Sequence, residues 1–293
     1  MKSPKIIITI DTEVGEKAKF SEGAFEKFVL GRIEKEEYGV SKIAEMLNNY
    51  NFKGEFFVDT YEGNFFGEQN FADLCTNLDN QGHGVQLHTH PSFAFDINRN
   101  YMHQYTIDEQ IKIIREGKRK IFSWIQKNPI AHRAGGYGAN IDTIKALESN
   151  SILMDSSFYY NHPNCKIHLP DIHEPFFIGD VLEIPISTLN HQQFLSWAFY
   201  LLYKRYPKFD VNYLNSFFMN TSIQKYHSTY ITLFLHSSSF IRRSKNNRDV
   251  IGLNKGALNV FSNVLSFISE KNYEVISLSD VMTMTLNKNK DLS

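Results

Sequence analysis

Polar side chains able to do chemistry follow several short apolar segments of this sequence. They stand singly or in pairs at the ends of five segments: Asp11 and Glu13, His88 and His90, Arg133, Asp155, and His236. In a barrel of parallel strands, the carboxyl ends of all strands meet at one rim, which is where barrel active sites form. The sequence therefore predicts a single site built from these residues.

Two of these sets are pairs of residues two positions apart. On an extended strand such residues point to the same side, so Asp11 shares a face with Glu13, and His88 shares one with His90. Two imidazoles and a carboxylate form the usual shell of a catalytic divalent metal with an open position for water. The alternatives are a hydrogen-bonded histidine pair and two acids that close a turn. With His236 beside them, the pairs favour a metal site.

The site residues need a scaffold of alternating strands and helices. Apolar, largely β-branched segments predict strands at 5–10, 55–58, 84–87, 130–133, 152–155, 182–186, 230–235 and 274–277. Apolar residues at helical spacing predict helices at 40–49, 70–80, 107–124, 142–149 and 257–271. This alternation is typical of a parallel sheet, open or closed.

Composition and charge exclude several classes of protein. The 293 residues include 31 basic and 32 acidic side chains, a net charge of -1, which gives no reason to expect nucleic acid or an anionic membrane as the partner. The longest apolar stretch, 194–203, is about half of the roughly 20 residues that a membrane-spanning helix needs. The apolar run 6–10 is too short for a signal peptide. We therefore expect a cytoplasmic protein without a membrane span, and its oligomeric state stays open.

No internal repeat or linker divides the sequence. We expect one domain over residues 1–286, with insertions near 15–38, 161–179 and 191–229, the last of them helical and rich in aromatic residues. Residues 287–293 are polar and are expected to form a frayed tail.

The motifs resemble those of the polysaccharide deacetylases, which remove acetyl groups from amino sugars with a bound metal. The resemblance runs over nearly the whole chain and is carried by five segments: 8–13 (ITIDTE), 54–58 (GEFFV), 82–91 (GHGVQLHTHP), 132–138 (HRAGGYG) and 233–237 (LFLHS). It implies a distorted, TIM-like (β/α) barrel with seven or eight mostly parallel strands. The arginine motif, 132–138, lacks the usual proline of the family and has one glycine more.

The resemblance implies a metal shell of Glu13, His88 and His90, with zinc as the expected ion. The family's first motif commonly has adjacent aspartates, whereas one residue separates the two acids here, so the roles of Asp11 and Glu13 can be exchanged. The usual second histidine stands four residues after the first, where this sequence has Ser92. His90 is the nearest substitute, and the choice between His90 and Ser92 stays open.

The resemblance also assigns catalytic roles. Asp11 would act as general base, and Arg133, able to hold a carboxylate with two nitrogens, would keep it in place and ionised. His236 would be the general acid, and the backbone N–H of Tyr137 would stabilise the oxyanion. Asp155 would orient His236, or it would only cap its strand.

These roles predict a metal-dependent hydrolase that cleaves a C–N amide bond, most simply by deacetylating an N-acylated amino sugar in glycan metabolism. A small-molecule or glycan substrate follows, such as a nucleotide-linked or lipid-linked sugar. The alternatives are hydrolysis of a non-sugar or cyclic amide, and a catalytically inactive carbohydrate-binding barrel.

Overall fold

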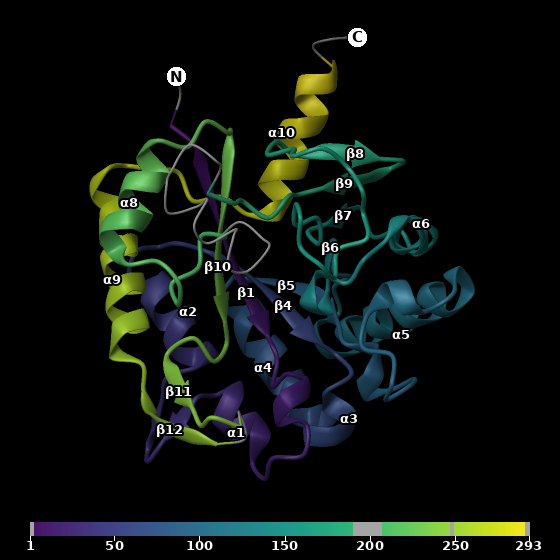
Figure 1. Cartoon of the computed structure of the whole chain (residues 1–293), viewed down its shortest axis with the longest axis horizontal. Helices are drawn as coiled ribbons and strands as arrows, with labels where there is room; N and C mark the ends of the chain where they lie inside the picture. Colours follow the sequence, from purple (N-terminus) through teal and green to yellow (C-terminus); the bar gives the residue numbers. More distant parts are fainter. Residues whose placement is uncertain (1–2, 190–206, 247–248, 291–293) are drawn as a thin grey trace.

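An eight-stranded sheet forms the centre of the computed structural model, which describes residues 3–189, 207–246 and 249–290 (Figure 1). The strands lie in the order β10 (Tyr230–His236), β1 (Lys5–Thr12), β4 (Gly54–Asp59), β5 (Gly84–Thr89), β6 (Ala131–Ala134), β7 (Met154–Asp155), β9 (Val181–Glu183), β8 (Phe176–Ile178). Every neighbouring pair is parallel except β8 with β9. The sheet is curled and surrounded by helices, which confirms the predicted distorted (β/α) barrel.

The barrel closes at a seam, where β10 lies beside the segment that follows β9. The backbone N–H of Ser187 donates to Thr232 Oγ1 at 2.7 Å, and the N–H of Thr232 donates to Ser187 Oγ at 3.0 Å. Farther along β10, the N–H of Phe234 donates to the carbonyl oxygen of Phe209 at 2.8 Å. These bonds satisfy buried groups on the free edge of β10, where unpaired N–H groups would be costly. They also bring residues 207–212 to the rim of the sheet.

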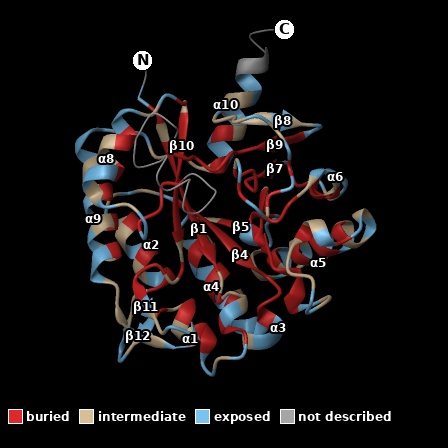
Figure 2. Ribbon diagram, in the orientation of Figure 1, coloured by how far each residue is buried: buried red, intermediate tan, exposed pale blue. Residues whose placement is uncertain are grey.

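Helices cover the outside of the sheet and turn their apolar faces inward (Figure 2). The longer ones are α2 (Val40–Asn48), α4 (Glu68–Asn80), α5 (Ile107–Ile125), α6 (Ile141–Ser149), α8 (Ser216–Gln224), α9 (Lys255–Glu270) and α10 (Leu278–Lys290), and α3 (Gly63–Phe66) is a single turn. In α5, the Thr106 hydroxyl accepts from the N–H of Glu109 and caps the first turn. Ile113, Ile114 and Ile121 are buried on one stripe of this helix.

Three predicted strands are corrected by the structure, and one of them, 182–186, is shortened because β9 ends at Glu183. The segment 152–155 is reduced to the two residues of β7, and 274–277 contributes only a bridge between Val275 and Ile6. Because β4 begins opposite Ile8, only the first residues of β1 are open on that side, which leaves little room for a strand. The antiparallel β8 was not predicted and lies inside the expected loop 161–179.

The predicted insertions contain short elements. Residues 15–38 form η1 (Glu16–Ala18), α1 (Ala24–Phe28) and the hairpin of β2 (Arg32–Ile33) with β3 (Glu36–Glu37). Of the insertion 191–229, residues 191–206 lie outside the described residues, and the rest includes α8. A second hairpin joins β11 (Ile241–Arg243) to β12 (Val250–Leu253). The tail expected to fray from residue 287 is helical as far as Lys290.

Among the described helices, none combines the length and the apolar character needed to cross a bilayer.

Candidate metal centre and active site

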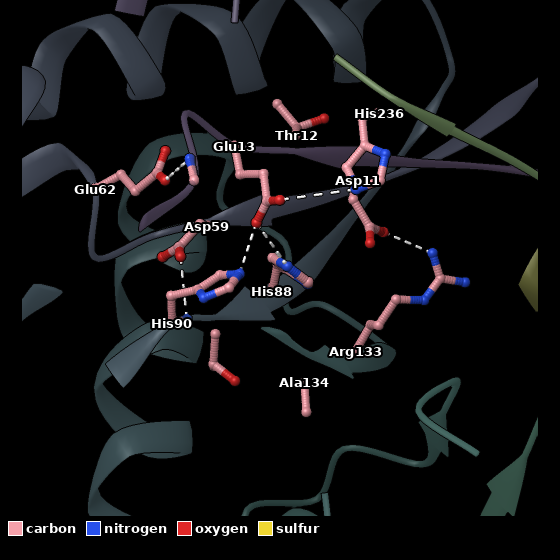
Figure 3. A network of polar contacts seen from close by, with 12 residues as sticks. Asp11, Thr12, Glu13, Asp59, Glu62, His88, His90, Arg133, Ala134 and His236 are labelled. Carbon is pink, nitrogen blue, oxygen red and sulfur yellow. Dashed lines mark hydrogen bonds and ion pairs between the residues drawn. The ribbon is translucent and has the colours of Figure 1, made fainter. Parts of the chain in front are cut away.

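The residues predicted at the strand ends, with the exception of Asp155, meet at one end of the sheet (Figure 3). Asp11 lies beside His236 in the parallel register of β1 and β10, and His88 lies beside Arg133 in that of β5 and β6. Glu13 directly follows β1, and His90 directly follows β5. These side chains therefore lie at one rim, as expected for residues at the carboxyl ends of parallel strands.

Glu13 is the centre of the cluster (Figure 3). Its Oε2 lies 3.2 Å from His88 Nε2 and 2.7 Å from His90 Nε2, and its Oε1 lies 3.8 Å from His236 Nε2. One ligand atom from each of Glu13, His88 and His90 lies within 4.8 Å of the other two. Because ligands bonded to zinc at about 2.0–2.2 Å lie roughly 3–4 Å apart, these three have the types and approximate spacing of one metal site.

The surroundings of this group suit a cation. Burial opposes the charge on Glu13, yet His90 and His88 outweigh burial and hold the pKa of the carboxyl well below its ordinary value. Burial likewise opposes a charged His90, but nearby carboxylates, Glu13 first, raise the pKa of the ring to about 10. The buried Nε2 of His90 lies 2.7 Å from Glu13 Oε2, but the two atoms are not aligned as a hydrogen bond, and Nε2 has no other hydrogen-bond partner among the described residues. A ring nitrogen left in this way fits a metal ligand.

Asp11 is held by a buried arginine. Its Oδ1 accepts a hydrogen bond from Arg133 Nη1 at 2.6 Å, and Arg133 is fully buried. The other donors of this guanidinium go to Ser156, Nε to the carbonyl oxygen and Nη2 to the hydroxyl, both at 3.0 Å. Arg133 therefore holds Asp11 with one nitrogen and not with the two that we expected. Burial opposes the charge of Asp11, but Arg133 and two histidines hold its pKa below the ordinary value.

A pocket of about 280 Å³ lies in front of Asp11 and His236. It adjoins a groove of about 700 Å³, and both share Glu13, His90 and His236 in their walls. Together they have the volume of a small-molecule or sugar site. Burial and the Lys208 ammonium lower the pKa of His236 against the opposing effect of Glu13 and Asp11.

Tyr137, predicted at the oxyanion position, lines this pocket. Its φ of 61° lies in the left-handed region, which costs energy for a residue with a side chain. The Tyr137 hydroxyl accepts a hydrogen bond from Lys208 Nζ at 2.6 Å. Lys208 is only 7% exposed, and its Nζ lies 3.5 Å from Asp210 Oδ2. Sequence reasoning missed Lys208, because nothing in its spacing indicates that the seam brings it to the rim.

Asp155 lies away from His236. Its Oδ1 is 2.8 Å from His132 Nδ1, and His132 Nε2 is 3.0 Å from Thr89 Oγ1. In the register of β6 and β7, Asp155 is the partner of His132. Asp155 Oδ2 also accepts the N–H of Ser157 at 3.1 Å, so its described contacts match the alternative of a strand-end cap and not the orientation of His236.

Two buried carboxylates at the end of β4 were also missed. Asp59 Oδ2 accepts from the backbone N–H of His90 at 3.0 Å, and Glu62 accepts from the N–H groups of Val14 and Gly15 at 2.6 and 2.8 Å. Burial raises the pKa of both, that of Asp59 to about 6. Asp59 directly follows the predicted strand 55–58, so its position at a strand end could have identified it as a site residue. Glu62 lies beyond the strand and carries no such signal.

Comparison with known proteins connects this geometry to one group of solved structures. No family model and no curated protein matches the sequence. A protein from Mycobacterium smegmatis assigned to the polysaccharide deacetylases has a TM-score of 0.60 at 15% identity, over 99% of this chain and 92% of the other. A peptidoglycan N-acetylglucosamine deacetylase has a TM-score of 0.52 at 12% identity, over 94% and 86% of the two chains.

A third solved structure of similar fold is described as a pseudoenzyme of the CE4 family from Bacillus anthracis. Its TM-score is 0.51 at 9% identity, over 95% of this chain and 65% of the other. The chain thus has the fold of the polysaccharide deacetylases, which confirms, at the level of the fold, the resemblance seen in the motifs. At these identities the likeness concerns the fold alone.

Proposed function

We propose that this protein is a metal-dependent hydrolase that cleaves the C–N amide bond of an N-acylated amino sugar. The observation that carries the proposal is the division between two acids at one rim. Glu13 lies against His88 and His90, while Asp11, two residues earlier, is held apart by Arg133. A ligand set beside a separate, ionised carboxylate is what a metal-assisted hydrolysis requires.

Glu13, His88 and His90 would hold the metal, which fits the Glu–His–His donor set and the buried Nε2 of His90, whose 2.7 Å contact with Glu13 is not an aligned hydrogen bond. When bound, a divalent ion supplies polarisation of the amide carbonyl and lowers the pKa of water toward about 7. The donor types are those of zinc, which stays our prediction for the ion, as does the cytoplasmic location.

Asp11 takes the proton of the attacking water. A base must be ionised to do so, and the Arg133 guanidinium keeps Asp11 ionised although it is buried. Since Arg133 is itself fixed by two bonds to Ser156, the carboxylate is held in one orientation.

His236 donates a proton to the departing amine. It ends β10 beside Asp11, and its side chain is about one third exposed, so substrate can reach the ring. Its pKa lies below the ordinary value, which makes the protonated ring a stronger donor. By the family resemblance, the backbone N–H of Tyr137 stabilises the oxyanion.

The inactive carbohydrate-binding barrel remains the second candidate, because a pseudoenzyme shares this fold. A binding protein has no use for a base, a buried arginine that holds it, and an acid across the rim. The substrate is a glycan or a small amide, for which a nucleotide-linked or lipid-linked N-acetyl sugar is the first candidate.

The test compares the wild type with Asp11→Asn and with a control, Thr12→Val, whose side chain points away from the site (Figure 3). Each zinc-loaded protein is assayed for acetate release from N-acetylglucosamine oligomers and a nucleotide-linked N-acetylhexosamine. Asp11→Asn should lower turnover by about 10²–10⁴-fold, because an amide cannot take the proton of water. Its zinc content should stay close to that of the wild type.

A loss below tenfold in Asp11→Asn would contradict the role of base. A loss of zinc in the same variant would make Asp11 a ligand and exchange its role with that of Glu13. Wild-type protein that binds zinc and oligosaccharide but releases no acetate would support the inactive barrel.

A further inference from the structure

Two departures from the family motifs lie side by side in the structure. One is the second histidine, His90, which stands two residues after His88 and not four. The other is the additional glycine of the arginine motif. Thr89 pairs with Ala134 in the register of β5 and β6, so the next residues of the two strands, His90 and Gly135, are neighbours. His90 and Gly135 are far apart in the sequence, and the pairing of β5 with β6 brings them together.

Gly135 leaves the space that the His90 ring occupies. A Cβ atom at Gly135 would lie 2.5 Å from Cε1 and Nε2 of His90 and 2.6 Å from Cδ2. Such distances are far below a van der Waals contact of about 3.5–4.0 Å, so any side chain here would push the ring away. The φ of Gly135 is not in the left-handed region, and the requirement for glycine is therefore the contact and not the backbone.

Asp59 holds the backbone of His90 from the other side. Its Oδ2 accepts the His90 N–H at 3.0 Å, and its Oδ1 accepts the Tyr61 N–H at 2.8 Å. With φ of -111° and ψ of 89°, His90 continues the extended strand and points its ring to the side of His88.

Ser92, at the family's usual ligand position, points elsewhere. Its hydroxyl donates to Glu16, and its carbonyl oxygen accepts from Lys19 Nζ at 2.8 Å. The described contacts of Ser92 therefore join it to the segment after β1, and the place of a second imidazole is left to His90.

We propose that Gly135 and Asp59 are positioning residues that hold His90 as the second imidazole of the metal centre, and that Gly135 is what permits a His-x-His motif on this fold. This inference rests on the proposed metal site but concerns binding of the metal, not hydrolysis. Residues that orient metal ligands typically contribute 10–100-fold to metal affinity.

The experiment measures Zn²⁺ affinity by competition with a chromophoric chelator, together with the melting temperature of each variant. Gly135→Ala is expected to bind Zn²⁺ about 10–100-fold more weakly than the wild type. Gly138→Ala is the matched control, because Gly138 lies in the same loop as Gly135 but the nearest atoms to its Cβ, at 2.6–2.8 Å, would belong to Tyr101 and not to His90. Gly138→Ala and Ser92→Ala should keep the wild-type affinity, while Asp59→Asn should weaken binding.

A double-mutant cycle shows whether Gly135 acts through His90. His90→Ala should itself cost at least about tenfold in affinity, and Gly135→Ala should add nothing in the His90→Ala background. Additive losses, a loss in Gly138→Ala equal to that in Gly135→Ala, or unchanged affinity in Gly135→Ala would overturn the inference. Tight, Gly135-dependent Zn²⁺ binding without acetate release would leave the inference intact and contradict the proposed hydrolysis.

Discussion

The two acids of the first motif differ in their partners although only Thr12 separates them. Asp11 contacts the permanently charged Arg133, and Glu13 contacts the two imidazoles of His88 and His90. A fixed cation keeps Asp11 available as a base, whereas histidines can give their protons up to a metal ion. The different environments of these two acids are the basis for our proposal that Asp11 takes the proton and Glu13 binds the metal.

The role of His236 as general acid can be tested separately. We expect His236→Ala to lower turnover of the zinc-loaded protein by about 10²–10⁴-fold, since the amine would leave without a proton donor. Zn²⁺ affinity should stay near the wild-type value, because His236 is not in the proposed ligand set. Its Nε2 lies 3.8 Å from Glu13 Oε1, which is too far for a direct hydrogen bond. Turnover and affinity are measured on the same preparation. A tenfold loss of affinity would identify His236 as a ligand.

At this scale, the residue types and their two-residue spacing predicted that Glu13, His88 and His90 lie close together. They could not show their contacts. Asp11 and Arg133 are 122 positions apart, and whether the guanidinium offers one nitrogen or two depends on Ser156, which no pattern connects to it. The same holds for Asp155, whose partner His132 follows from a strand register that the sequence does not state.

At the scale of elements, the order of neighbouring strands in the sheet positions the site residues. β4 lies between β1 and β5, and its last residue, Asp59, binds the chain that carries His90. Glu62, a few residues later, binds the chain after Glu13. The end of β4 and the turn after it thus hold the segments that carry His90 and Glu13, on both neighbouring strands.

The seam of the barrel gives a prediction about stability. In Thr232→Val, the buried N–H of Ser187 loses its acceptor, which should lower the free energy of unfolding by about 1–3 kcal/mol. Thr9→Val on β1 is the control, because the Thr9 hydroxyl only donates to a carbonyl oxygen and no N–H depends on it. Urea unfolding measures both. Equal losses in the two variants would show that the seam bonds do not have this role.

The start of β5 predicts a dependence on pH. The buried His83 accepts the N–H of Gly54 through Nδ1, and burial, with Lys53, lowers its pKa to about 4. In the unfolded chain a histidine takes up its proton near pH 6.5, before the folded one does. Stability from this group is therefore complete above about pH 6.5 and is lost as the pH falls toward about 4.

His83→Gln removes this titration. Its free energy of unfolding, measured in urea at a series of pH values, should fall less than that of the wild type between about pH 6.5 and 4. Other groups titrate in both proteins, so the difference between the two curves isolates His83. His168→Gln, at an exposed position, should follow the wild type. Identical curves for His83→Gln and the wild type would contradict the assignment.

The whole molecule is a curled sheet whose strand ends come from distant parts of the chain and meet at one rim. Alternating apolar and amphipathic segments predicted a parallel sheet, open or closed, and the family resemblance added the distorted barrel. The short elements were not predictable in the same way: β8 has three residues and pairs antiparallel with β9, and the seam is closed by side chains as well as by backbone. Neither has a period that a sequence pattern could reveal.

The central claim, amide hydrolysis that depends on one bound metal, is tested most directly by titrating metal into chelator-treated protein. Acetate release from the N-acetylated sugars is measured as Zn²⁺ is added in steps. We predict no release without metal, a rise with each addition, and saturation at about one equivalent per chain, as a single Glu–His–His site requires. Release that is already complete in the metal-free protein, or that stays absent when the site is full, would contradict it.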